Sequence, residues 1–230
     1  MTLEITRLSK GLTVVSDPMP GLENAALGVW VNTGSRNELP AEMGVSHMLE
    51  HMAFKGTATR SARDIAEQIE AVGGVLNAYT SREQTAFHAR VLKADVPLAL
   101  EMIGDILTNP TFEASELERE RQVVLQELGQ VRDTPDDIVF DHLQSTIYPG
   151  QPLGWPVLGE EKTVTAFNQE TLKSYLAAQY RAPAMTLIAS GAVDHATIIR
   201  LAQETCGGFN PGAAPACAPS HYQGGDFRER

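Results

Sequence analysis

The chain carries the stretch Gly44-Val45-Ser46-His47-Met48-Leu49-Glu50-His51-Met52-Ala53-Phe54. Its apolar residues occupy nearly every side of a helix, so we expect a buried helix over residues 44–55. His47, Glu50 and His51 share one face of that helix, because residues three and four apart are neighbours. Burying these polar side chains without partners would cost several kcal/mol, and a bound metal ion would remove that cost.

The order H-x-x-E-H is the inverted form of a common zinc-protease motif. Two neutral imidazoles can hold one Zn²⁺, and a neighbouring carboxylate can take a proton from a water that the metal activates. Alternatively, His47 and His51 could line a helix surface or lie hydrogen-bonded in the core. The apolar flanks favour the metal site, and we predict one zinc ion per chain.

A third protein ligand is expected on the acidic run from Glu113 to Glu127, which the sequence predicts to be a long helix. Most of its acids should be solvated. Glu120 and Glu127, however, share a face with Val123 and Val124 at spacings of three and four. One carboxylate as a metal ligand and the other as a hydrogen-bond partner of a ligand histidine would explain two acids on an apolar face.

With these motifs the chain resembles the pitrilysin-type (M16) zinc peptidases, in particular the branch of mitochondrial processing peptidase β subunits and their bacterial relatives. The resemblance runs from about Leu8 to the end of the chain. It rests on separated motifs in the same order, namely His47-x-x-Glu50-His51-Met-Ala-Phe54-Lys55-Gly56-Thr57, Leu76-Asn77-Ala78-Tyr79-Thr80, Glu120-Arg121-x-Val-Val-x-x-Glu127, Val139-Phe140-Asp141-His142-Leu143, Pro152-Leu153-Gly154 and Leu158-Gly159.

The resemblance implies a role for each polar residue of these motifs. His47, His51 and Glu127 would be the zinc ligands. Glu50 would be the general base and the later proton donor to the leaving amine. Glu120 would serve catalysis by orienting a ligand histidine.

Residues 75–80 and 85–91 are rich in β-branched and aromatic residues and flank a polar turn, so they predict a hairpin. In the resembled family, one strand of this hairpin is an edge to which the substrate peptide adds as a further strand. The resemblance therefore implies substrate-binding roles for Asn77 and Ala78. The alternative is an ordinary hairpin with a polar turn.

Acidic residues outnumber basic ones, 29 to 18, giving a formal net charge of −11. Such a chain is a poor nucleic-acid binder and tends to attract basic partners. Asp137 and Asp141 share one face of a helix predicted to follow Pro135. In the processing-peptidase branch, acids at these places contact an arginine of the substrate, for which a pair of carboxylates is well suited.

The predicted fold is α+β, with a mixed, mainly antiparallel sheet and helices packed on one face, as in one M16 peptidase-like half. Strands are expected at 4–7, 12–17, 24–33, 75–80, 85–91 and 184–190. Helices are expected at 44–55, 61–72, 94–108, 113–132, 136–147, 169–180 and 194–205.

Residues 1–205 are expected to form the zinc-binding catalytic domain, and residues 206–230 a Gly/Pro/Ala-rich loop or linker. Residues 224–228 resemble the start of a strand. The resemblance implies that a second domain follows, which is absent from this sequence, so the chain would need that domain or a partner subunit. A homodimer is an alternative.

No apolar run reaches membrane-spanning length, and no signal or transit peptide is visible, so we expect a cytoplasmic bacterial protein without a membrane partner. Cys206 and Cys217 are expected to be reduced, with a disulfide between them as the alternative.

We therefore predict a zinc endopeptidase domain acting on peptides or unfolded, presequence-like polypeptides. The alternatives are a non-catalytic scaffold and a metal- or peptide-binding module without turnover.

Overall fold

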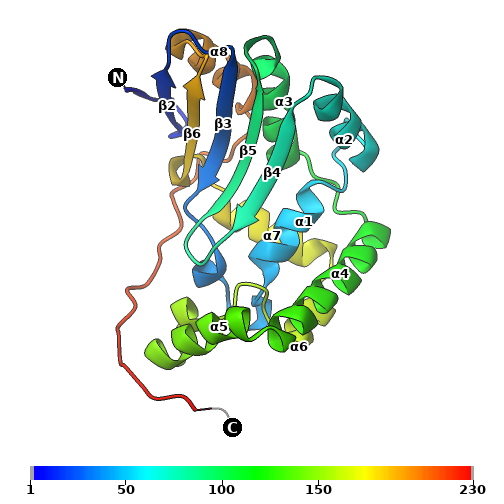
Figure 1. The fold of residues 1–230 in the computed structure, drawn as a ribbon, viewed down its shortest axis with the longest axis vertical. Coiled ribbons are helices and arrows are strands. Elements are labelled where there is room, and N and C mark those ends of the chain that lie inside the picture. Colours follow the sequence, from blue (N-terminus) through cyan, green and yellow to red (C-terminus); the bar gives the residue numbers. More distant parts are fainter. Residues whose placement is uncertain (1–2, 229–230) are drawn as a thin grey trace.

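A six-stranded sheet, in the order β1-β2-β6-β3-β5-β4, forms the centre of the computed structural model, which describes residues 3–228 (Figure 1). The strands are β1 Glu4–Arg7, β2 Thr13–Pro18, β3 Asn24–Val31, β4 Val75–Thr80, β5 Thr85–Leu92 and β6 Met185–Gly191. β2 and β6 are parallel, and all other neighbours are antiparallel. The predicted mixed, mainly antiparallel sheet is thus confirmed.

The pairing of β6 with β2 on one side and β3 on the other places it inside the sheet, and its alternating burial shows which of its faces the helices cover. Met185, Leu187 and Ala189 are buried, whereas the residues between them are half-buried. This period of two places one set of side chains toward the helices, as a strand covered mainly on one face requires.

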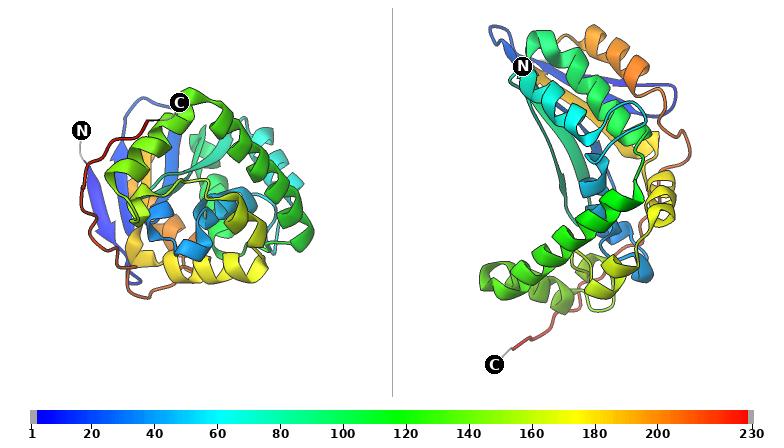
Figure 2. Two further views of the ribbon diagram at one scale, coloured as in Figure 1. Left: turned by 90° about the horizontal axis from the view of Figure 1, so that it is seen from below. Right: turned by 90° about the vertical axis from the view of Figure 1, so that its right-hand side faces the viewer.

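Helices cover one face of the sheet, as predicted. They are α1 Val45–Ala53, α2 Ala62–Ala71, α3 Val96–Thr108, α4 Ala114–Asp133, α5 Pro135–Ile147, α6 Glu161–Ala166, α7 Gln169–Gln179 and α8 His195–Thr205. The right-hand view of Figure 2 shows α2, α3 and α8 side by side on that face, while α4 and α5 lie beyond one end of the sheet.

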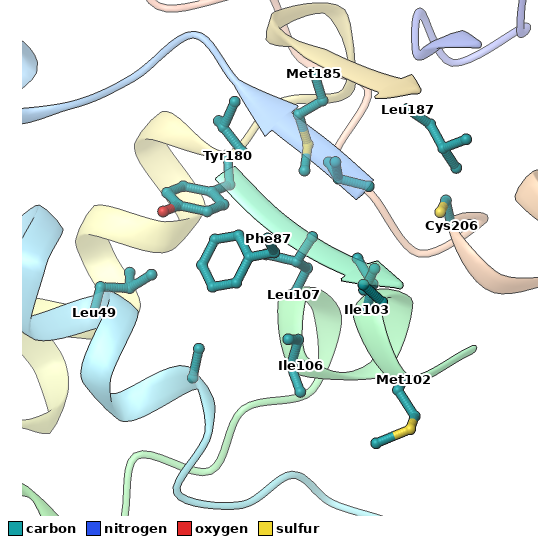
Figure 3. Packing of buried hydrophobic residues seen from close by; sticks show 14 of the residues in the cluster. Leu49, Phe87, Met102, Ile103, Ile106, Leu107, Tyr180, Met185, Leu187 and Cys206 are labelled. Carbon is teal, nitrogen blue, oxygen red and sulfur yellow. The ribbon is translucent and has the colours of Figure 1, made fainter. Parts of the chain in front are cut away.

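The core lies between the sheet and these helices (Figure 3). Phe87 of β5 is fully buried there, together with Ile103 of α3 and Leu187 of β6. Leu49 of α1 joins the same cluster. Each large apolar side chain buried in this way contributes about 1.5–3 kcal/mol, so α1 is held firmly against the rest of the molecule.

Most of the predicted elements are present within a few residues of their expected bounds. The sequence prediction missed α6, and the strand expected at 224–228 is wrong, because residues 206–228 form no helix or strand beyond an isolated bridge of Asn210 with Arg181. Residues 1–2 of the predicted domain 1–205 and residues 229–230 of the predicted linker 206–230 lie outside the part of the chain that the structure describes.

Both cysteines are free. No helix among residues 3–228 is long and apolar enough to cross a membrane.

Candidate metal centre and active site

The helix that carries the histidines begins at a well-bonded turn whose backbone conformation requires glycine. Gly44 is its N-cap residue, with φ of 91°. The Glu38 carboxylate accepts hydrogen bonds from the backbone amides of Gly44 at 2.7 Å and Ser46 at 2.9 Å. It therefore satisfies amides that a helix N-terminus leaves free. Burial raises the pKa of Glu38 to about 7, against the opposing effect of the hydrogen bonds from Ser46 and Gly44.

The buried side of α1 fixes the direction of its polar side. Met48, Leu49 and Met52 are at most 1% exposed. Because their positions on the helix are set by packing, His47 and His51 are turned toward α4, which packs against α1. Figure 1 shows the two helices meeting beside β4.

α4 brings two carboxylates to this junction. Leu117, Val124 and Leu128 are its buried apolar residues, and Glu120 is buried among them at 7% exposure. The Glu127 side chain is 38% exposed. Its position seven residues, or about two turns, after Glu120 places both acids on the side that faces α1.

His47, His51 and Glu127 converge on one point. Glu127 Oε2 lies 3.6 Å from His47 Nε2 and 3.6 Å from His51 Nε2, and one ligand atom of each residue lies within 4.8 Å of the others. Four ligands placed tetrahedrally about zinc at typical bond lengths are about 3.4 Å apart. The three donors therefore fit a single zinc ion with little rearrangement.

The electrostatic state of His47 suits metal binding. Burial, and to a lesser degree the neighbouring His51, lowers the pKa of His47 to about 4. His47 is thus neutral at pH 7 and can offer a lone pair. Its Nδ1 is buried and has no hydrogen-bond partner among the described residues. Two neutral imidazoles and one carboxylate are a donor set found in catalytic zinc sites.

Glu120 lies directly behind His51. Its Oε2 is 3.0 Å from His51 Nδ1, and its Oε1 is 2.7 Å from Lys55 Nζ. Burial alone would raise the pKa of Glu120, but the hydrogen bonds from Lys55 and His51 lower it overall. An ionised carboxylate can only accept, so His51 Nδ1 donates in this bond, and Nε2 is the ring nitrogen left to offer a lone pair to a metal, 3.6 Å from Glu127 Oε2.

Glu50 is held at the same junction by the end of β4. The Thr80 hydroxyl donates to Glu50 Oε2 at 2.6 Å. Burial raises the pKa of Glu50 above its usual value, against the lowering effects of Thr80 and His51, and Glu127 raises it further. A carboxylate whose pKa moves toward neutrality is a better general base.

The predicted substrate-binding residues Asn77 and Ala78 lie on β4, which is an edge strand of the sheet. They pair with His88 and Phe87 of β5, so only the other edge of β4 is open to a further strand. The Ala78 amide donates to Asn77 Oδ1 at 2.8 Å.

The two aspartates predicted to bind an arginine lie on α5, but they differ in surroundings. Asp137 is exposed. Asp141 Oδ1 instead accepts from Arg82 Nη2 at 2.7 Å, a bond between α5 and the hairpin turn. The arginine partner of Asp141 in this structure thus comes from the chain itself.

Three contributing residues were missed in the sequence. Lys55 lies four residues after His51, so helical spacing could have suggested it. Thr80 lies at the end of the predicted hairpin strand, but only the packing of β4 against α1 reveals its contact with Glu50. Glu38 gave no signal, because its burial depends on the loop that precedes α1.

Comparison with known proteins identifies the family of this chain. A family model described as Insulinase (Peptidase family M16) matches residues 13–161, and one described as Peptidase M16 inactive domain matches residues 166–230. The mitochondrial-processing peptidase subunit beta of Lentinula edodes is 43% identical over 87% of this chain and 43% of its own length. An uncharacterized zinc protease of Rickettsia felis is 40% identical over 96% of this chain and 54% of its own length.

A crystal structure of a protease from Helicobacter pylori has the same fold, with a TM-score of 0.88 at 24% identity. It is matched over 96% of this chain and 54% of its own chain. The chain thus spans about half the length of these relatives. The family expected from the motifs is confirmed, since its model covers more than half of the residues. The chain belongs to peptidase family M16.

Proposed function

We propose that this chain is the zinc-binding catalytic domain of an endopeptidase. The observation that carries the proposal is the convergence of His47, His51 and Glu127 from two helices far apart in sequence. Further support comes from the relative named as a zinc protease and the relatives named as processing-peptidase β subunits.

His47, His51 and Glu127 would hold the metal, one ion per chain. When bound there, zinc would supply a Lewis acid for the peptide carbonyl and the attacking water. Glu50 would accept the proton of that water at its carboxylate and return it to the leaving amine. Thr80 orients the Glu50 carboxylate by its hydrogen bond. Glu120 would keep the His51 ring in one tautomer and orientation.

The substrate would be a peptide or an unfolded, presequence-like polypeptide that adds to the open edge of β4. Strand addition binds through the backbone and tolerates varied side chains. Asn77 and Ala78 would contact it, and the Ala78 amide would exchange its bond to Asn77 for one to the peptide. Asp137 and Asp141 would favour an arginine in the substrate, which would replace Arg82 as the ion-pair partner of Asp141.

The complete enzyme would need more than this chain, because the chain spans about half the length of its relatives. A second domain or a partner subunit would complete the substrate site, and a homodimer is the alternative. We further propose a cytoplasmic bacterial location. The same partial coverage favours a second candidate function for the chain by itself, namely a metal- or peptide-binding module without turnover.

The test combines metal analysis with cleavage of an arginine-containing peptide. The wild-type chain, Glu50→Gln and the exposed control Glu118→Gln would each be assayed alone and with the carboxy-terminal half of a relative. We expect one zinc per chain in all three, and loss of cleavage by roughly 100-fold or more only in Glu50→Gln. Zinc without Glu50-dependent cleavage in either format would support the binding module, and wild type without stoichiometric zinc would support a scaffold.

A further inference from the structure

Lys55 lies just beyond α1, in a segment whose backbone is held on both sides. Its own amide donates to the Met52 carbonyl at 3.2 Å, and the Thr57 amide donates to the Arg60 carbonyl at 2.8 Å. Asp105 of α3 then accepts from the Thr57 hydroxyl at 2.6 Å and from Arg60 Nη1 at 3.0 Å. The starting point of the Lys55 side chain is therefore fixed relative to α1.

The ammonium of Lys55 is 2.7 Å from Glu120 Oε1, on the oxygen that does not face His51. The Lys55 side chain is 31% exposed, whereas the Glu120 side chain is 9% exposed. A charge-assisted bond to a carboxylate that water hardly reaches is stronger than a surface ion pair. The two oxygens of Glu120 are thus held by two different groups, which leaves the carboxylate a single orientation.

The charges of the site make this contact important. Glu127 lies 3.6 Å from both His47 and His51, Glu120 contacts His51, and Glu50 is near enough to His51 and Glu127 for their charges to affect its pKa. The centre is therefore rich in carboxylates. The next basic residue on α4, Arg121, is directed elsewhere, because its guanidinium donates to the carbonyls of Thr165 at 2.9 Å and Phe167 at 2.8 Å. Lys55 is the group whose positive charge offsets Glu120.

We infer that Lys55 is a positioning residue of the metal centre, which holds Glu120 so that Glu120 can fix the tautomer and direction of His51. It would act on the metal only through Glu120 and would touch neither the metal nor the substrate. The inference rests on the proposed function, since it needs zinc at His47, His51 and Glu127.

The experiment measures zinc affinity of the 230-residue chain by competition with a coloured chelator, so it needs no turnover. The variants are Lys55→Met, which keeps the aliphatic stem, Lys55→Arg, which keeps the charge, and Lys162→Met, an exposed control on α6. We expect about 10-fold weaker zinc binding in Lys55→Met, the lower end of the loss seen when partners of ligand histidines are removed. Lys55→Arg should stay within about threefold of wild type, and Lys162→Met should not differ from it.

A double mutant separates positioning from a general effect on folding. Glu120→Gln alone should weaken zinc binding by about 10-fold to 100-fold. In the Glu120→Gln background, Lys55→Met should add no more than about twofold, because groups acting through one another are not additive. Should Lys55→Met fail to fold, Lys55→Gln takes its place in both backgrounds.

Each outcome is decisive. Equal zinc affinity of wild type and Lys55→Met would overturn the role of Lys55, as would an additional loss of more than about twofold in the Glu120→Gln background. A wild-type chain that binds no zinc would instead refute the proposed function itself.

Discussion

At the scale of single residues, His47 carries a measurable consequence of its burial. Its pKa is about 4 in the folded protein and near 6.5 in the unfolded chain, so the unfolded state binds more protons between these values. In the metal-free protein, the contribution of His47 to the free energy of unfolding is thus complete above pH 6.5 and is lost as the pH falls toward 4. The total loss from this residue is about 3 kcal/mol.

The measurement is urea unfolding of wild type and His47→Asn in a chelator, from pH 4 to 8. Glu38 has the opposite effect. Because its pKa is raised in the folded protein, its contribution to stability is lost as the pH rises from 4.5 to about 7. Both proteins share Glu38, so the difference between them isolates His47. We expect the variant to lose less stability than wild type on acidification. Parallel curves would show that His47 is not held neutral by the fold.

At the scale of elements, the entry of the chain into α1 should be the most sensitive turn near the site. Gly44 has φ of 91°, and a Cβ placed there would lie 2.5 Å from the Leu158 carbonyl oxygen. Gly21 has a similar φ of 89° but open space around it, which makes it a matched control. Gly44→Ala should therefore combine backbone strain with a clash.

Denaturant unfolding should show that Gly44→Ala destabilises the chain by roughly 2–4 kcal/mol, and Gly21→Ala by about 1–2 kcal/mol. Zinc affinity should fall only in Gly44→Ala, because that turn sets the start of the histidine helix. Equal effects of the two substitutions would mean that the approach of Leu158 to Gly44 can relax without cost.

The contact between the hairpin and α5 yields a prediction about specificity. If Asp141 receives a substrate arginine, Arg82 competes for it through the bond of 2.7 Å. Arg82→Gln should then bind an arginine-containing peptide roughly two to five times more tightly, as expected for removal of a partly exposed ion pair. Fluorescence anisotropy in the Glu50→Gln background measures this without cleavage.

Arg63→Gln is the control for that experiment, since Arg63 is an exposed residue of α2 with a local partner, Glu67. Unchanged or weaker peptide binding by Arg82→Gln would assign Asp141 to fixing the hairpin rather than to the substrate.

The sequence predicted those parts of the fold and site that depend on local spacing. Helical periodicity placed His47 and His51 on one face of α1, and Glu120 and Glu127 on one face of α4. The β-branched and aromatic residues on either side of a polar turn located the hairpin. Contacts across long distances in sequence were not predictable, as the pairing of Arg82 with Asp141 shows. The short helix α6 has too few turns for a periodic pattern. Helical spacing singled out Glu120 and Glu127 among the acids of α4, but only the family resemblance assigned Glu127, rather than Glu120, as the metal ligand.

At the scale of the whole molecule, the site lies where two helices meet an edge strand of the sheet. α1 and α4 supply the donors, and β4 supplies the open edge beside them (Figure 1). The chain spans about half the length of its relatives, so we expect the metal centre to form in this chain, whereas turnover should depend on the remaining half or on a partner.

The most direct measurement is a crystal structure of the chain grown with zinc, with data collected at the zinc absorption edge. The account predicts one anomalous peak per chain, between His47 Nε2, His51 Nε2 and the Glu127 carboxylate, which disappears in Glu127→Gln. A peak at another place, or none in a crystal of the wild-type chain with zinc present, would contradict it.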